Sequence, residues 1–472
     1  MKYVSTSLNE KYLMDSLVKS KFFTSSALIL FTSILVYQYI TFGPFAPLQC
    51  QLLRIGCLDT EIHGYVAPEF IDVKKAFIKN FENGYEIGSS VAVYYDGNLV
   101  VDLQGGYADL EAKRKYDNNT LQPVFSSTKV MSAIMIAYLV DRGFLDYNKK
   151  VSTYWPEFAQ GNKENVTLLD LVNHRAGLSY LNTKVTKSDL EDLDKFAKTL
   201  ASQPHSFNGV SSRAYHATTV GWYLNEIVRR VDPKHRTIGK IISDEILEQY
   251  DLEFYLLLPP NFISRVAKLY EISKIRGIFD MFNVFFEWWI GMIPNSYFSE
   301  FNDKESVMYK TFQPSGPFKI SDFSDLETLT VEWPSVNGIT NAKSMAKLGA
   351  IIVNNGQPIN SVTYKPLISK STIDLMSTKL PETFDHVLYK NITPASGGFA
   401  YLRYPGIEDV EFIGWGGYGG SSFIWNRELG ISFGYAMNGL LPPKYGKTGD
   451  LRLWSVLKEV VNVAKKLKKE QA

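Results

Sequence analysis

Polar and apolar residues alternate in two stretches that lie near opposite ends of the chain. In "SSVAVYYDGNLVVDLQGGYAD" (89–109) the alternation turns around at Asp96-Gly97, a pair that readily takes the positive φ angles of a tight hairpin. A second hairpin is predicted for "SSFIWNRELGISFGYAMNG" (421–439). Helical periodicity fills the chain between them. The order predicts an α/β (α+β) fold, with one antiparallel sheet assembled from both termini, flanking helices, and a mainly helical insertion at about 144–330.

Several helices are predicted from the spacing of apolar residues. The first is apolar nearly all round, covers 126–142 and ends at Gly143, and a short helix follows within 166–181. Amphipathic helices are expected at 188–202, 218–231 and 451–469. The aromatic segment "GIFDMFNVFFEWWIGMIP" (277–294) favours a core helix of the insertion. The alternative is a lid over an apolar substrate or a surface that dips into a membrane.

The N-terminal region differs from the rest of the chain. Residues 22–42 carry no charge and are long enough to span a bilayer, and Lys19 and Lys21 precede them. Basic residues on this side favour an N-inside orientation. We therefore expect a short cytoplasmic tail (1–21), a transmembrane signal anchor (22–42), a linker (43–62) and a lumenal or extracellular domain (63–465). A cleaved signal peptide is the alternative, but the apolar run is long and no convincing cleavage site follows it.

Glycosylation sequons and cysteines agree with such a location. Asn118, Asn165 and Asn391 each begin an N-x-S/T triplet. The two cysteines, Cys50 and Cys57, could close a small disulfide in an oxidising compartment, and palmitoylation is the alternative if the orientation is reversed.

Charge and motif content exclude several functions. The 50 basic and 49 acidic side chains balance, so no overall field attracts nucleic acid. The six histidines show no metal-binding spacing, and the sequence contains no P-loop or dinucleotide fingerprint. We expect neither metal nor cofactor. The oligomeric state is not predicted.

Candidate chemistry lies at the start of the first helix, in "FSSTK" (125–129). Ser126 and Lys129 stand three residues apart, so both side chains lie on one helix face. Ser126 occupies the first turn, where unpaired N–H groups favour developing negative charge. Burial would disfavour the charged form of Lys129 and let it act as a base toward the serine. An N-cap serine beside a snorkelling lysine is the structural alternative.

Further motifs turn this pair into a resemblance. "TLLDLVNHRAGL", "YHATTVGWYLNEIV" and "FIGWGGYGGSSFIWN" follow "FSSTK" in the order found in serine β-lactamase-related hydrolases. That family includes class C β-lactamases, penicillin-binding proteins and family VIII carboxylesterases, and the similarity covers about 63–465. It implies the β-lactamase/transpeptidase-like fold, Ser126 as nucleophile and Lys129 as its partner. Tyr215 matches the catalytic tyrosine, for which a lowered pKa is expected. Trp415-Gly416-Gly417 matches the third motif, and the N–H groups of Tyr418 and Ser126 would form the oxyanion hole.

Two positions depart from the penicillin-recognising members. Trp415 replaces a cationic or titratable residue, and Ala217 replaces an asparagine. Both changes weaken the case for β-lactam or D-Ala-D-Ala substrates and favour an ester, an amide or a small peptide. The predicted function is a membrane-anchored serine hydrolase that forms an acyl-enzyme at Ser126. A catalytically weak scaffold that retains the fold is the alternative, and a true β-lactamase or D,D-peptidase ranks last.

Other candidates are weaker. Gly430-Ile431-Ser432-Phe433-Gly434 matches a nucleophile elbow, but it continues as a strand and no histidine follows it. His174 and His216 are interpreted as structural residues near the site.

Overall fold

A single antiparallel sheet runs through the computed structural model, which describes residues 25–39, 41–58, 60–313, 316, 322–323, 325–442 and 449–471. Strands β1–β3 come from the N-terminal part of the chain and β9–β14 from the C-terminal part, and β2 pairs with β14 where the two parts meet. The prediction of one sheet built from both ends is confirmed. In order across the sheet the strands are β1 (Ile62–Val66), β3 (Asn98–Asp109), β2 (Gly88–Tyr95), β14 (Ile431–Met437), β13 (Ser422–Asn426), β12 (Phe412–Gly416), β11 (Ala400–Leu402), β10 (Lys390–Pro394) and β9 (Thr383–Asp385), with β4 (Arg114–Lys115) beside β3.

Both predicted hairpins form. Asp96 and Gly97 have φ angles of 43° and 80° and join β2 to β3. Strands β13 and β14 make the second hairpin. Every residue of β2 and β14 is buried, because helices cover the centre of the sheet on both faces.

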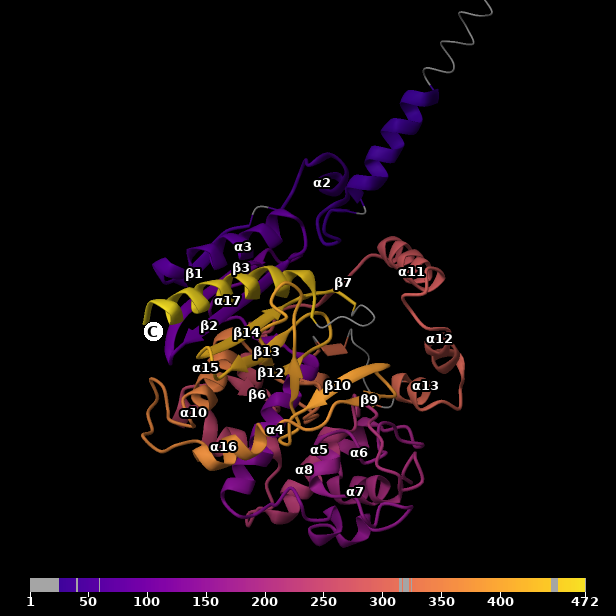
Figure 1. Cartoon of the computed structure of the whole chain (residues 1–472), viewed down its shortest axis with the longest axis vertical. Helices are drawn as coiled ribbons and strands as arrows, with labels where there is room; N and C mark the ends of the chain where they lie inside the picture. Colours follow the sequence, from indigo (N-terminus) through magenta and orange to yellow (C-terminus); the bar gives the residue numbers. More distant parts are fainter. Residues whose placement is uncertain are drawn as a thin grey trace, which may run out of the picture.

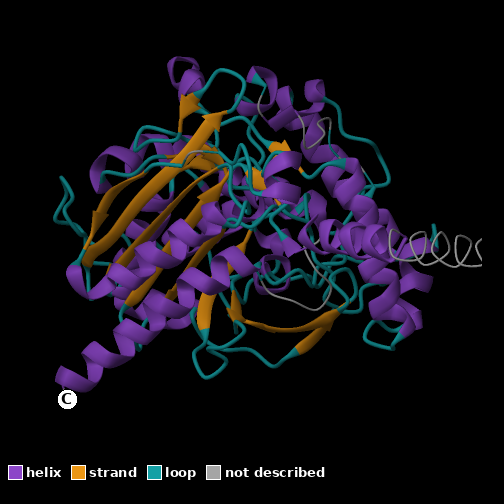
Figure 2. Cartoon of the chain, turned by 90° about the horizontal axis from the view of Figure 1, so that it is seen from above, coloured by secondary structure: helices purple, strands orange, loops and turns teal. Residues whose placement is uncertain are grey.

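The helices form a layer on each side of the sheet (Figures 1 and 2). Helices α3 (Ile71–Glu82) and α17 (Leu451–Gln471) pack together on one face. Helix α15 (Ala342–Val353) packs on β14, β2 and β13 from the other face, where α4 (Thr128–Asp141) and α16 (Lys370–Met376) also lie.

The region between α4 and α15 is mainly helical and extends over the lower and right-hand parts of Figure 1. It is tied to the strand that precedes α4 through a small sheet of β5 (Gln122–Pro123), β8 (Ile339–Thr340) and β6 (Phe254–Tyr255). A parallel pair, β7 (Tyr270–Glu271) with β15 (Gly439–Leu440), makes a further link. Its helices are α5 (Leu168–Val172), α6 (Lys187–Glu191), α7 (Leu193–Ser202), α8 (Val220–Val231), α9 (Ile238–Ile241), α10 (Leu247–Tyr250), α11 (Lys274–Trp289), α12 (Asn295–Asn302), α13 (Val307–Phe312) and α14 (Leu326–Leu329).

The N-terminal segment projects from this body (Figure 1). Residues 25–39 are helical, a short α2 (Leu48–Leu53) follows, and Cys50 and Cys57 form a disulfide. The predicted tail, 1–21, and residues 22–24 and 40 of the predicted anchor lie outside the described residues. Within the described ranges, no helix combines the length and the apolar character that crossing a membrane requires.

Helix α11 corrects one expectation. The segment 277–294 was predicted as a core helix, but within α11 only Arg276 is buried. Phe282, Phe285, Phe286 and Trp289 are exposed, so the interpretation as a core helix is wrong.

Candidate active site

Ser126 sits at the entrance to α4, in the 3-10 turn η2 (Phe125–Ser127). It is the one residue between 121 and 139 that is not buried. Phe125, directly before it, has a φ of 45°, an unfavourable angle for a residue with a bulky side chain. Such strain persists only where the surroundings impose it, and it is frequent beside reactive groups. The turn therefore presents the Ser126 hydroxyl at the surface of an otherwise buried segment.

Lys129 lies beneath this hydroxyl. Its Nζ donates hydrogen bonds to Ser126 Oγ at 3.1 Å and to the carbonyl oxygens of Ala217 and Ser335 at 2.6 and 2.9 Å. Burial holds the Lys129 pKa well below its usual 10.5, because the charged form loses hydration. A neutral amine has two N–H donors and one lone pair. Once Lys129 is neutral, its two N–H groups can stay on the two carbonyls and its lone pair can accept the Ser126 proton.

Tyr215 lies next to Ser126 and Lys129, with its ring centroid 4.9 Å from Lys129 Nζ. Its phenol is hydrogen-bonded to Ser126 and accepts a hydrogen bond from Trp415 Nε1 at 3.2 Å. Burial outweighs both interactions and raises the Tyr215 pKa to about 12. The expectation of a lowered pKa is therefore wrong: the phenol is protonated at neutral pH, and Lys129 is the group whose neutral form is favoured.

The third motif lies where β12 ends, next to the nucleophile turn. The Trp415 ring packs 5.4 Å from that of Tyr215, and the Tyr418 ring packs 5.8 Å from that of Phe125. A Cβ at Gly417 would lie 2.2 Å from the carbonyl oxygen of Val124, so only glycine permits this approach. At Gly416 the only near atom would be 3.3 Å away.

Two buried charges that the sequence analysis did not single out hold Tyr215 in place. Asp385 accepts hydrogen bonds from Arg213 Nε at 3.0 Å and from the backbone N–H of Tyr215 at 3.1 Å. It also accepts from the N–H groups of Val387 and Leu388, both at 2.9 Å. The two residues are 172 positions apart in the chain, and no short motif could have linked them.

A third buried charge holds the loop that carries Tyr418. Arg452, on α17, is fully buried and pairs with Glu86 and Asp450. It also donates hydrogen bonds to the backbone carbonyls of Gly439 and Gly419, the latter directly after Tyr418. Burial raises the Glu86 pKa to about 7. The closing helix thus fixes the position of the loop opposite Ser126.

Comparison with known proteins places the chain in a family. Residues 77–458 match the Beta-lactamase family over most of the chain. The protein belongs to the beta-lactamase family. It is 28% identical over 386 residues to the esterase/beta-lactamase LipL of Mycobacterium tuberculosis, covering 81% of this chain and 84% of LipL. The predicted resemblance is confirmed.

Solved structures agree with this membership. A family VIII carboxylesterase superposes with a TM-score of 0.73 at 27% identity, and a penicillin-binding protein homologue from Caulobacter crescentus with 0.70 at 28%. Each match covers 85% of this chain and all of the other chain. This beta-lactamase family member is accordingly a serine hydrolase with the β-lactamase/transpeptidase-like fold.

The remaining candidates have structural positions. His216 Nδ1 bonds to the carbonyl of Ala214, and its Nε2 accepts from the N–H of Leu178. Burial lowers the His216 pKa to about 3 and holds the His174 pKa well below 6.5, so both rings are neutral. Ser432 is fully buried within β14 and donates to the carbonyl of Ala346. Ser432 therefore cannot act as a surface nucleophile, in agreement with the prediction that this segment is a strand and not a nucleophile elbow.

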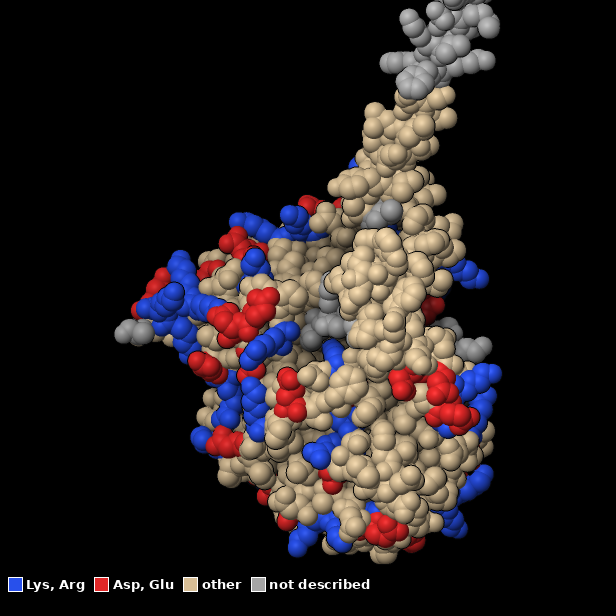
Figure 3. All heavy atoms as spheres, turned by 45° about the vertical axis from the view of Figure 1, so that its right-hand side comes forward, with Lys and Arg blue, Asp and Glu red and all other residues tan. Residues whose placement is uncertain are grey.

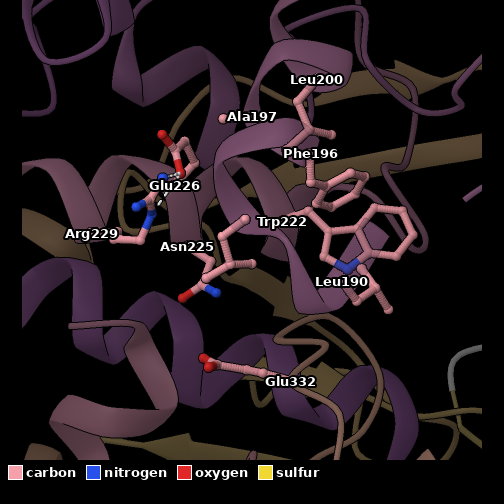
Figure 4. Close-up of a pocket in the computed structure, with 10 residues that line it drawn as sticks. Leu190, Phe196, Ala197, Leu200, Trp222, Asn225, Glu226, Arg229 and Glu332 are labelled. Carbon is pink, nitrogen blue, oxygen red and sulfur yellow. Dashed lines mark hydrogen bonds and ion pairs between the residues drawn. The ribbon is translucent and has the colours of Figure 1, made fainter. Parts of the chain in front are cut away.

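A small pocket lies between α7 and α8, and no residue of the site lines it (Figure 4). Its volume of about 20 Å³ holds a single water molecule. Trp222 on its wall stacks on Trp333 at 4.9 Å. The pocket is therefore a packing gap next to Trp333, in the segment that also contains Ser335. Among the described residues, no group of His, Cys, Asp and Glu side chains is arranged to hold a metal ion.

Proposed function

We propose that this protein hydrolyses carboxylic esters or amides through an acyl-enzyme on Ser126. The observation that carries the proposal is the position of Lys129, whose Nζ donates to Ser126 Oγ and to the carbonyls of Ala217 and Ser335. Burial favours its neutral form, and a neutral amine that keeps both N–H groups on the carbonyls turns its lone pair toward Ser126. Lys129 takes the serine proton while Ser126 Oγ bonds to the substrate carbonyl carbon. The N–H groups of Ser126 and Tyr418 stabilise the resulting oxyanion.

Tyr215 completes the proton transfer. Because its phenol is protonated and hydrogen-bonded to Ser126, it gives its proton to the leaving alkoxide or amine as the tetrahedral intermediate collapses. The Lys129 ammonium then returns a proton to Tyr215. Water deacylates the enzyme by the same steps in reverse, releasing the acid and restoring Ser126.

The surroundings of Tyr215 favour an apolar substrate. Ala214, Val387, Val307 and Trp415 pack around it, and the Trp415 indole donates its N–H to the phenol. Trp415 stands where penicillin-recognising members carry a cationic or titratable residue that meets the substrate carboxylate. This supports esters and amides with an apolar acyl or alkyl group over β-lactams or D-Ala-D-Ala peptides.

We also propose that the apolar segment 22–42 anchors the protein in a membrane, with the domain from about residue 63 lumenal or extracellular. The lysines before the segment support the orientation. Asn118, Asn165 and Asn391 are exposed, as glycosylation requires, and the Cys50–Cys57 disulfide suits an oxidising compartment. Carbonate extraction of cell membranes and a glycosidase-sensitive mobility shift test the anchor and the orientation separately.

A fluorophosphonate probe tests the chemistry. We expect the full-length protein to be labelled at Ser126, with labelling abolished in Ser126→Ala and strongly reduced in Lys129→Met. Ser432→Ala is the matched control and should label normally. A folded wild-type protein that takes no label and hydrolyses no ester would instead favour the scaffold function.

A further inference from the structure

Helix α11 (Lys274–Trp289) is amphipathic, and its wide apolar face is exposed. Side chains at i, i+3, i+7, i+10 and i+14 form the centre of that face. All five are exposed, with Phe282 at 66% and Trp289 at 72%. The set comprises Ile275, Ile278, Phe282, Phe285 and Trp289.

The opposite side of α11 carries a narrow polar strip. At 100° per residue, Arg276, Asp280, Asn283 and Glu287 fall within one arc of the helix. They include every charged residue between Ile275 and Trp289. The helix thus has the wide apolar face and narrow polar strip of a segment that lies in a lipid interface.

The polar strip joins α11 to the end of the N-terminal helix. Arg276 is buried, and its Nη1 donates to the backbone carbonyls of Tyr39 and Phe42. The Phe279 ring contacts the Tyr39 ring at 5.5 Å. Two apolar helices from distant parts of the sequence are therefore held together, on the same side of the body (Figure 1).

The N-terminal helix is itself uncharged and exposed. Residues 25–39 contain no acidic or basic side chain, and Leu28, Ile29, Leu30 and Phe31 are all exposed. In Figure 3 the helix and the surface next to its base form one continuous area with few charged groups. Exposed apolar patches of this extent mark interaction sites.

We propose that the apolar face of α11 lies in the surface of a lipid bilayer, beside the point where the N-terminal segment enters it. A bilayer covers both elements at once: the projecting helix enters the hydrocarbon, and α11 at its base lies at the level of the headgroups. Tryptophan and phenylalanine are the residues that such a position favours. The orientation rests on the anchor proposed above, whereas the contact itself is independent of the reaction at Ser126.

This contact lies at one end of a segment that reaches the active site. After α11, helix α12 leads to Val307, the first residue of α13, which packs in the cluster around Tyr215 and Trp415. Thr311, on α13, is hydrogen-bonded to Ser179 at 2.9 Å. The bilayer is thereby placed next to an element that forms part of the site wall.

Depth-dependent quenching tests the proposal. The two native cysteines are paired, so a cysteine introduced in the full-length protein is the only free thiol. Phe282→Cys and Phe285→Cys, labelled with an environment-sensitive fluorophore, are reconstituted into phosphatidylcholine/phosphatidylserine vesicles that contain doxyl lipid. Tyr364→Cys, at a position that is 93% exposed in the loop between α15 and α16, is the matched control. Ile34→Cys reports the anchor.

We expect the emission of the α11 labels to be blue-shifted. Shallow doxyl groups should quench these labels at least about twice as strongly as the Tyr364 label. Quenching at Ile34 without quenching at Phe282 and Phe285 would refute the contact and leave the anchor intact. Quenching on α11 without quenching at Ile34 would support the contact and refute the anchor. A blue shift on α11 that doxyl lipid does not quench would overturn the proposal and point to a second protein copy on this face. Absence of both effects at all positions would refute both proposals.

Discussion

Replacing Asp385 by asparagine should destabilise the protein strongly, although the residue is far from the surface and touches no substrate. The Asp385 and Arg213 side chains are 0% and 2% exposed, and Nε and Oδ2 are 3.0 Å apart. At an effective dielectric constant of about 20, unit charges at this separation attract by about 5 kcal/mol. Removing one partner of a buried ion pair costs about 3–5 kcal/mol, because the remaining charge stays buried and unpaired.

The asparagine keeps an oxygen for the backbone N–H groups of Tyr215, Val387 and Leu388 but turns an amide N–H toward the guanidinium. We therefore expect Asp385→Asn to lower the free energy of unfolding in urea by about 3–5 kcal/mol. Asp409→Asn is the matched control, since Asp409 forms its ion pair with Lys465 at the surface, where the Asp409 side chain is 70% exposed. It should leave the urea midpoint unchanged.

The folded fraction of the Asp385→Asn variant should also label more slowly with fluorophosphonate, because Tyr215 has lost the partner that fixes its position. A loss of less than about 1 kcal/mol, the value typical of an exposed pair, would refute the role given to Asp385. If the variant is strongly destabilised but labels at the normal rate, the ion pair stabilises the fold without positioning Tyr215 for the reaction.

Four further predictions concern the site itself. Gly417→Ala should fold but label at least about tenfold more slowly, because its Cβ would push the loop away from the nucleophile turn. Gly416→Ala is the control and should label normally. Equal labelling rates for the two variants would contradict the close approach of Gly417 to Val124. The labelling rate should rise with pH as Lys129 loses its proton, and the always-protonated Lys129→Arg should be inactive; a pH-independent rate would exclude Lys129 as the base. Folding lowers the Lys129 pKa below 10.5, so between the folded-state and unfolded-state pKa values the unfolded chain binds more protons than the folded one. The free energy of unfolding should therefore fall as the pH falls through that range. Lys129→Met removes the titrating group and should make the free energy of unfolding depend less on pH in that range. Trp415→Phe removes the hydrogen bond to Tyr215 and should slow ester hydrolysis by about fivefold to tenfold, the equivalent of about 1 kcal/mol; an unchanged kcat would show that the indole only packs.

Local sequence was sufficient where the interaction is local. Asp96-Gly97 predicted its hairpin because the turn requires positive φ. Helix α4 was predicted because a segment of helical length is apolar nearly all round, as a fully buried helix requires, and ends at Gly143. The spacing of Ser126 and Lys129 placed both on one face, since three residues of helix fix that geometry. The order of the motifs predicted the remaining site positions and the family. The comparison confirmed the family.

Tertiary structure decided the properties that depend on burial and on distant partners. The Tyr215 pKa was predicted in the wrong direction, because desolvation depends on neighbours from several elements and the motif contains none of them. The Arg213–Asp385 ion pair and the hydrogen bond from Arg452 to the Gly419 carbonyl were not predicted either, because their partners come from distant parts of the chain. Helix α11 shows the limit most clearly: its aromatic residues describe a buried helix and a membrane-facing helix equally well. The composition of a segment sets how strongly it avoids water, but only the packed structure decides whether protein or another phase covers it.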